Sequence, residues 1–145
     1  MSDEVSTYTL FFDGCSKGNP GKAGAGAVLY REKEDKGEDE AEEIWSQAQF
    51  VGKKETNNYA EYMGLILGLE EVIKVIDLQH LLVKGDSLLV IKQMQGVYQV
   101  KAPNLIPLYQ RAVGLVKQLP SVEFQHVYRL ANKRADALSN AALLL

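Results

Sequence analysis

Four acidic residues stand where the sequence is otherwise apolar or rich in small residues. Asp13 follows the run YTLFF, and Asp86 closes the run HLLVKGD. Glu61 lies within the apolar segment NNYAEYMGLILGL, and Asp136 lies within KRADALSNAA. Carboxylates that are gathered together repel one another and bind protons unless a cation neutralises them. Because hard oxygen ligands suit Mg²⁺ or Mn²⁺, we predict that these four residues form a divalent-metal site.

Each acid also has a purely structural explanation. Asp13 and Asp86 adjoin glycines, and Asp is a common turn former. Glu61 and Asp136 lie near expected helix starts, where a negative charge interacts favourably with the helix dipole. For any one residue the structural explanation is at least as good, but the four together, with the motifs around them, favour the metal site.

The metal hypothesis requires elements that bring the four acids together. In open α/β sheets, ligands bind outside the carboxyl ends of the parallel strands. Asp13 and Asp86 each end an expected strand, so they would meet there if those strands are adjacent and parallel. Helices that begin near the same edge would add Glu61 and Asp136.

Hydrophobic periodicity predicts three strands, a helix, a strand, two helices, a strand and a final helix. The expected strands are residues 8–12, 25–30, 43–51, 80–87 and 122–128, the main expected helices are residues 57–75, 105–119 and 133–144, and the expected loops include a wide one over 14–24 and another over 96–104. The later alternation of strands and helices implies parallel pairing. We therefore predict an α/β fold with a mixed five-stranded sheet, whose three opening strands are antiparallel, and helices on both faces. At 145 residues without linkers, residues 1–145 are expected to form a single domain.

The composition, 46% hydrophobic and 24% charged, is typical of a globular protein. The net charge of -3 argues against binding nucleic acid mainly through bulk charge. Residues 31–43 hold eight acids and three bases, and are expected to form a solvated loop more readily than an acidic docking surface. No apolar run could span a bilayer and no secretion signal is recognised, so we expect an intracellular monomer, cytoplasmic or nuclear, without membrane contact.

The glycine-rich segment GNPGKAGAG does not fit a nucleotide-binding loop. A P-loop requires Ser or Thr after its Lys, but Lys22 is followed by Ala23. The dinucleotide fingerprint lacks its third glycine, and the segment leads into an expected strand instead of a helix. No nucleotide cofactor is therefore predicted.

Four ordered motifs resemble those of the type 1 ribonucleases H and cover nearly the whole chain: FFDGCSKGNPGKAGAGAVL, ETNNYAEYMGLILGLE, VKGDSLLVIKQ and HVYRLANKRADALSNAA. The resemblance implies endonucleolytic hydrolysis of the RNA strand of RNA–DNA hybrids, leaving 3′-hydroxyl and 5′-phosphate ends. The family's metal-binding carboxylates fall on Asp13, Glu61, Asp86 and Asp136. The implied mechanism uses two divalent ions about 4 Å apart, one activating water and the other stabilising the leaving oxygen.

The same resemblance suggests that substrate is contacted by Asn19, Thr56, Asn57 and Asn58. Amides and hydroxyls can hydrogen-bond 2′-hydroxyls, base edges in a shallow minor groove, and phosphates. Local roles also fit, with Asn19 in a turn before proline and Thr56 or Asn57 as a helix cap. The two kinds of role are compatible.

Many members of the family carry a histidine in a loop before the last helix, and this sequence has none between Val127 and Asp136. Some relatives place an arginine just after the strand, where Arg129 falls. A guanidinium contacts phosphate but cannot act as a general acid or base near neutral pH. We therefore assign Arg129 to phosphate or product handling at the catalytic site, with a salt bridge to the carboxylates as the alternative.

Some members also have a basic, tryptophan-containing extension between the middle helices. Here the segment 96–104 is short, with Lys101 as its only base. Weaker hybrid affinity and a shallow salt dependence are expected. Two other functions stay open: a catalytically silent nucleic-acid-binding module, and a related nuclease acting on other duplexes. The presence of all four carboxylates favours the hybrid-cleaving enzyme.

Overall fold

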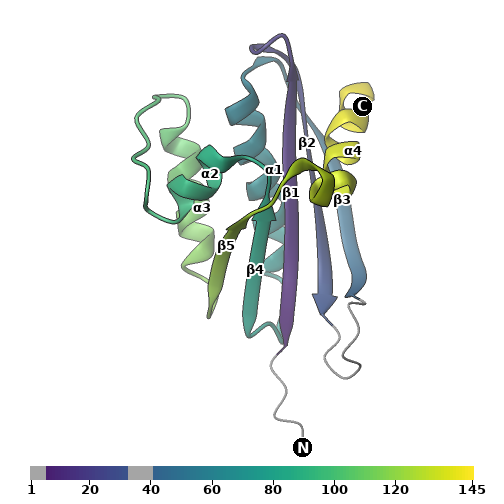
Figure 1. Ribbon diagram of the computed structural model, residues 1–145, viewed down its shortest axis with the longest axis vertical. Coiled ribbons are helices and arrows are strands. Elements are labelled where there is room, and N and C mark those ends of the chain that lie inside the picture. Colours follow the sequence, from purple (N-terminus) through teal and green to yellow (C-terminus); the bar gives the residue numbers. More distant parts are fainter. Residues whose placement is uncertain (1–5, 33–40) are drawn as a thin grey trace, which may run out of the picture.

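The computed structural model describes residues 6–32 and 41–145. The sheet has the strand order β3-β2-β1-β4-β5. Its strands are β1 (Thr7–Lys17), β2 (Gly21–Glu32), β3 (Ala41–Glu55), β4 (His80–Gly85) and β5 (Val122–His126), and the helices are α1 (Asn57–Val72), α2 (Leu88–Met94), α3 (Ile106–Val116) and α4 (Lys133–Ala141). Antiparallel pairing joins the first three strands, and parallel pairing joins β1 to β4 and β4 to β5. The predicted mixed sheet is confirmed (Figure 1).

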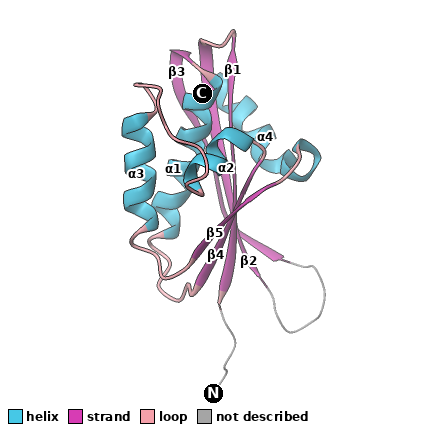
Figure 2. Cartoon of the chain, turned by 60° about the vertical axis from the view of Figure 1, so that its left-hand side comes forward, coloured by secondary structure: helices cyan, strands magenta, loops and turns pink. Residues whose placement is uncertain are grey.

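Helices cover both faces of the sheet, as expected. On one face α1 packs against β1 and β2, and α3 packs against α1; on the other face α4 packs against β1, β2 and β3 (Figure 2). The largest buried side chains of the core are Tyr8, Tyr62, Phe12, Leu10, Leu29, Leu65, Leu69, Leu81, Ile91 and Leu115. Burial of this apolar surface is the main force that fixes α1 on the sheet.

The first strand does not end at Asp13, as the sequence suggested. Its parallel ladder with β4 stops at the pair Phe12 and Gly85, whereas its antiparallel ladder with β2 continues to the pair Lys17 and Lys22. Asp13 is therefore the first residue of β1 that β4 no longer flanks. A continuous strand holds this carboxylate beside the open end of β4.

The structure also corrects the wide loop expected over residues 14–24, most of which belong to strands. The two strands form a long hairpin whose turn covers only residues 18–20. Gly18 in this turn has a φ of 118°, which favours glycine. Gly24 and Gly26 are instead strand residues, and a Cβ on either would collide with α4. The small residues therefore permit close helix packing, which the sequence pattern alone does not distinguish from a loop.

The other boundaries differ from expectation mainly at element ends. Helix α1 ends at Val72 instead of residue 75, and β4 ends at Gly85, just before Asp86. The final helical segment comprises a 3-10 turn (Arg129–Asn132), α4, and a second 3-10 turn (Ala142–Leu144). The acidic segment expected to form a loop lies mostly outside the described residues. No helix in the described ranges is long and apolar enough to cross a membrane.

Candidate metal centre

Three of the four predicted carboxylates converge at the point where β1 leaves β4. One oxygen from each of Asp13, Glu61 and Asp86 lies within 4.8 Å of the other two. Asp13 comes from β1, Asp86 immediately follows β4, and Glu61 comes from the second turn of α1. The fourth, Asp136 in the first turn of α4, lines the same cavity of about 290 Å³. Two strands and two helices thus bring together acids that are up to 123 positions apart.

Close backbone approach places Glu61 against β1. A Cβ on Gly14 would collide with the backbone of Ala60 and Glu61, and a Cβ on Gly64 would collide with the carbonyl oxygen of Asp13. Glycine at both positions therefore lets α1 lie close enough to bring its carboxylate beside Asp13. At the start of α1, the Thr56 hydroxyl accepts a hydrogen bond from the Tyr59 N–H at 3.2 Å.

Polar side chains of the last helical segment hold Asp136 against β1. The Asn132 amide donates to the Phe12 carbonyl at 2.9 Å. The buried Ser139 hydroxyl lies 2.8 Å from the Asp136 carbonyl oxygen and 3.4 Å from an Asp13 carboxylate oxygen. The Asn140 amide lies 3.4 Å from the Asp136 carboxylate. Sequence reasoning missed Ser139 and Asn140, although their spacing three and four residues after Asp136 places them on its face of a helix.

Burial and mutual repulsion disfavour charge on the central carboxylates. Burial raises the pKa of Asp13 to about 8, with the negative charge of Asp86 and contact with Asp136 adding to the effect. Burial also raises the pKa of Glu61 well above its usual value, and the charges of Asp13 and Asp86 raise it further. The Glu61 Oε1 atom is buried and has no hydrogen-bond partner among the described residues.

These observations match the requirements of a hard divalent cation. The cluster contains several carboxylate oxygens close together and a buried oxygen without a donor. The cavity is lined by four acids but only two bases, Lys17 and Arg129. A cation would satisfy the orphan oxygen and favour ionised Asp13 and Glu61. The donor set is all oxygen, as Mg²⁺ and Mn²⁺ prefer.

Arg129 lies at the rim of this cavity. Its guanidinium nitrogen is 3.7 Å from an Asp136 carboxylate oxygen, and 79% of its side chain is exposed. The contact corresponds to the salt-bridge alternative, while the exposure leaves the guanidinium accessible to a phosphate. His126 ends β5 and packs edge-on against the Tyr128 ring, with the ring centroids 5.2 Å apart.

Of the predicted substrate-contacting residues, only Asn57 lines the carboxylate cavity. Its side-chain oxygen accepts the Ser16 N–H at 2.8 Å, and its own N–H donates to the Asn19 side chain at 2.9 Å. Thr56 is the helix cap, and Asn58 is exposed on the first turn of α1. Asn19, Thr56, Asn57 and Asn58 therefore surround the junction of the hairpin turn with α1, beside the cavity.

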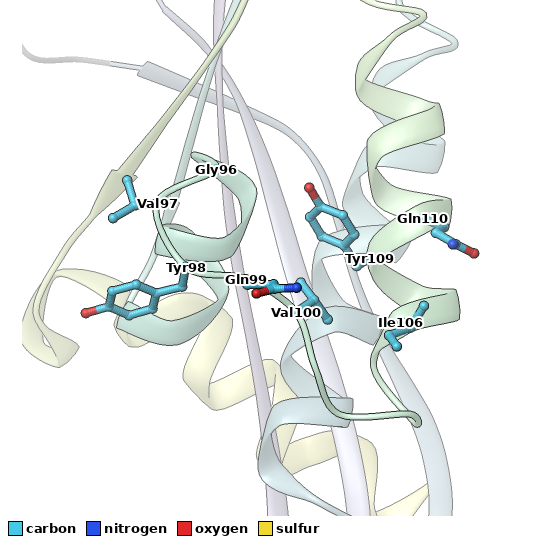
Figure 3. A pocket seen from close by; sticks show the side chains of 8 residues that line it. All are labelled: Gly96, Val97, Tyr98, Gln99, Val100, Ile106, Tyr109 and Gln110. Atoms are coloured by element: carbon cyan, nitrogen blue, oxygen red, sulfur yellow. The ribbon is translucent and has the colours of Figure 1, made fainter.

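A second cavity, of about 510 Å³, lies between the segment after α2 and the helix α3. Figure 3 shows Val100 near Tyr109 and Ile106 of α3, while Val97 and Tyr98 project to the other side of the segment. Its lining contains neither acid nor base. The four carboxylates belong to a different cavity, so this one has no part in the metal centre.

The amino-acid sequence of this chain is similar to those of several known proteins. The family described as "Reverse transcriptase-like" matches residues 11–142. A "Bifunctional protein" of Mycobacterium tuberculosis is 40% identical over 131 residues, covering 90% of this chain but only 34% of its own length. A "Ribonuclease H" of Pseudomonas fluorescens is 30% identical and covers 97% of this chain and 92% of its own. The chain thus spans about a third of the mycobacterial relative.

Solved structures agree with these sequence relationships. The N-terminal RNase H domain of the mycobacterial protein has a TM-score of 0.85 and 37% identity, covering 96% of this chain and 94% of that one. The enzyme LC11-RNase H1, from compost and solved in complex with an RNA/DNA hybrid, has a TM-score of 0.80 and 34% identity. That alignment covers 94% of this chain and 96% of the other.

Proposed function

Because this chain belongs to the type 1 ribonuclease H family, we propose that it hydrolyses the RNA strand of RNA–DNA hybrids. The observation that carries the proposal is the convergence of Asp13, Glu61 and Asp86 within 4.8 Å, with Asp136 in the same cavity. The hybrid present in the LC11-RNase H1 structure supports the choice of substrate.

Asp13, Glu61, Asp86 and Asp136 would hold two divalent cations, with Mg²⁺ as the expected metal and Mn²⁺ as a substitute. Bound cations supply Lewis acidity, which activates water and stabilises the departing 3′ oxygen. The products would carry 3′-hydroxyl and 5′-phosphate ends. Asp13 is best placed to serve both cations because it lies between the carboxylates of α1, α4 and the end of β4.

The residues around the cavity would position the nucleic acid. The Asn57 amide faces the cavity, and its contacts with Ser16 and Asn19 fix the hairpin turn beside it. Arg129 can contact a phosphate because most of its side chain is exposed. Its charge also offsets that of Asp136, so its loss should impair both phosphate binding and product release.

Cleavage of end-labelled substrates tests the proposal directly. An RNA–DNA hybrid, duplex RNA, duplex DNA and single-stranded RNA would be incubated with the protein in Mg²⁺, in Mn²⁺ and in EDTA. We expect cleavage of the RNA in the hybrid alone, only with metal, and products with 3′-hydroxyl ends. Preferred cleavage of another duplex would establish a different nuclease, and binding without cleavage would establish a catalytically silent module.

Substitutions at the site provide the second part of the test. Glu61→Gln keeps the shape of the buried side chain but removes its charge, and we expect a loss of at least about a hundredfold in cleavage. Glu123→Gln on β5, where the side chain is 66% exposed, is the matched control and should cleave like the parent. Equal rates for the two variants would refute the assignment of Glu61.

A further inference from the structure

Four lysines gather at the tip of the β1–β2 hairpin and the adjoining end of β3. This hairpin lysine cluster comprises Lys17, Lys22, Lys53 and Lys54, all of them exposed. We propose that it binds phosphates of the duplex several nucleotides away from the scissile bond. The inference rests on the proposed function and extends it by assigning a second binding surface.

The strand register connects the cluster to the carboxylates. Lys17 pairs with Lys22 across the hairpin, and Asp13 pairs with Gly26 in the same ladder. Side chains alternate along a strand, so Lys17, four residues after Asp13, lies on the same face of the sheet. Lys17 also lines the carboxylate cavity. The positive surface therefore begins at the cavity rim and continues to the hairpin tip.

The third strand adds the other two charges. Gly21 pairs with Glu55 and Ala23 pairs with Gly52, which places Lys53 and Lys54 beside the hairpin end of β2. As consecutive strand residues they point to opposite faces, Lys54 to the face of Lys22 and Lys53 to the other, so the cluster surrounds the end of the sheet. The Lys22 ammonium of β2 lies 6.0 Å from the centroid of the Phe50 ring, which belongs to β3 like Lys53 and Lys54. None of the four lysines forms an ion pair with a carboxylate of residues 6–32 or 41–145.

The hairpin tip is anchored to the catalytic side of the fold. The Asn19 side chain accepts the Asn57 N–H at 2.9 Å, and the Ser16 hydroxyl donates to the Glu55 carbonyl at 2.6 Å. These bonds tie β1, the turn and the end of β3 to the start of α1. A binding surface that is held rigidly relative to Glu61 loses little conformational freedom when the duplex binds.

The chemistry of the cluster suits a phosphate backbone. Lysine binds phosphate as a point charge and carries no base specificity, which matches a surface that positions any sequence. From Asp13 to Lys17 the strand rises roughly 13 Å, the distance of about four phosphates along one strand at 3.4 Å each. Because the net charge of the chain is -3, attraction of a nucleic acid depends on a local concentration of bases such as this one.

Salt-dependent binding tests the inference separately from cleavage. The Asp13→Asn protein, which retains bound substrate uncut, would be titrated with a fluorescent hybrid of about 16 base pairs over a range of KCl concentrations in Mg²⁺. Against this background, Lys22→Gln, Lys53→Gln and Lys54→Gln would be combined, leaving Lys17 unchanged because it lines the cavity. We expect the triple variant to bind more than about tenfold more weakly at low salt, with the slope of log affinity against log salt reduced in magnitude by about 2 to 3.

The control triple variant changes the same charge elsewhere, through Lys74→Gln, Arg111→Gln and Lys117→Gln, and should keep the parent slope. An unchanged slope in the cluster variant, or an equal loss in the control, would overturn the inference. Failure of the protein with intact Asp13 to cleave any hybrid would instead refute the proposed function, while the binding comparison would still be informative.

Discussion

Replacing Asp13 by Asn should stabilise the metal-free protein while abolishing its activity. Burial raises the pKa of this carboxyl from 3.8 to about 8, so the folded state holds its proton more tightly than the unfolded chain does. The stability associated with this proton is fully present below about pH 4 and is lost as the pH rises through about 8. At pH 8 the ionised carboxylate is therefore a cost to folding that Asn does not carry.

The size of the effect follows from the same pKa. A change of about four pKa units at 1.36 kcal/mol each gives a ceiling of about 6 kcal/mol. Asp13 and Glu61 titrate as an interacting pair, so part of this cost remains with Glu61 in the variant. We expect a net stabilisation of about 2 kcal/mol at pH 8, which corresponds to a rise in Tm of about 4–8 °C.

Urea and thermal unfolding at pH 5 and pH 8, each with EDTA and with Mg²⁺, would measure this effect. In EDTA the advantage of Asp13→Asn should be large at pH 8 and small at pH 5. Saturating Mg²⁺ should stabilise the parent by about 2.7 kcal/mol at a hundred times its Kd, and the variant by much less. The order of stability at pH 8 should therefore reverse.

Asp77 is the control for the sign of the effect. The Tyr8 hydroxyl donates to it, and this hydrogen bond holds its pKa below the usual value, with the charge of Arg31 contributing. Asp77→Asn should therefore destabilise the protein above the unfolded pKa of this acid, and the difference should shrink as the pH falls. If Asp13→Asn also destabilised the metal-free protein at pH 8, the repulsive cluster inferred from the structure would be wrong.

Three further substitutions test how the site is positioned. Gly14→Ala should lower the free energy of unfolding by about 3 kcal/mol or more, measured by urea titration, because the new methyl group collides with the Ala60 backbone. The control Gly114→Ala should be tolerated, because the added methyl group meets no other part of the fold within 4 Å. Thr56→Ala should cost about 1 kcal/mol in the same assay through loss of the helix cap, and no loss would contradict the capping role. Ser139→Ala should weaken Mg²⁺ binding about tenfold by calorimetry and lower kcat while leaving the KM for the hybrid unchanged, whereas a rise in KM alone would contradict a role in positioning the carboxylates.

The convergence of the carboxylates was predictable because the sequence marks each of them locally. Asp13 and Asp86 follow apolar runs, and Glu61 interrupts the apolar surface of a long helix. The sheet topology was predictable because the first part of the chain contains successive strands, which indicates antiparallel pairing. The later part alternates strands and helices, which indicates parallel pairing. The position of Asp136 in the cavity depends on Ser139 and Asn132, whose contacts cross more than a hundred residues of sequence.

The continuation of β1 beyond Asp13 was not predictable by the same reasoning. Glycine signals a turn in a local pattern, yet Gly14 and Gly26 are strand residues that admit α1 and α4 at close range. Which of the two roles applies is decided by helices that come much later in the chain. The hairpin lysine cluster was not predicted for the same reason, because Lys17 and Lys22 pair only when the strands extend into the expected loop.

Because β1 continues without interruption past Asp13, the length of the hairpin sets the distance between the carboxylates and the hairpin lysine cluster. One strand leads from the buried interior, past the Asp13 carboxylate that is proposed to bind metal, to a turn flanked by Lys17 and Lys22. Adding two residues to each arm would preserve which face every side chain occupies and would move the turn outward by roughly 7 Å. Adding a single residue to each arm would turn the outer lysines to the opposite face. Reach along a bound duplex could therefore be varied in discrete steps without disturbing the reacting groups.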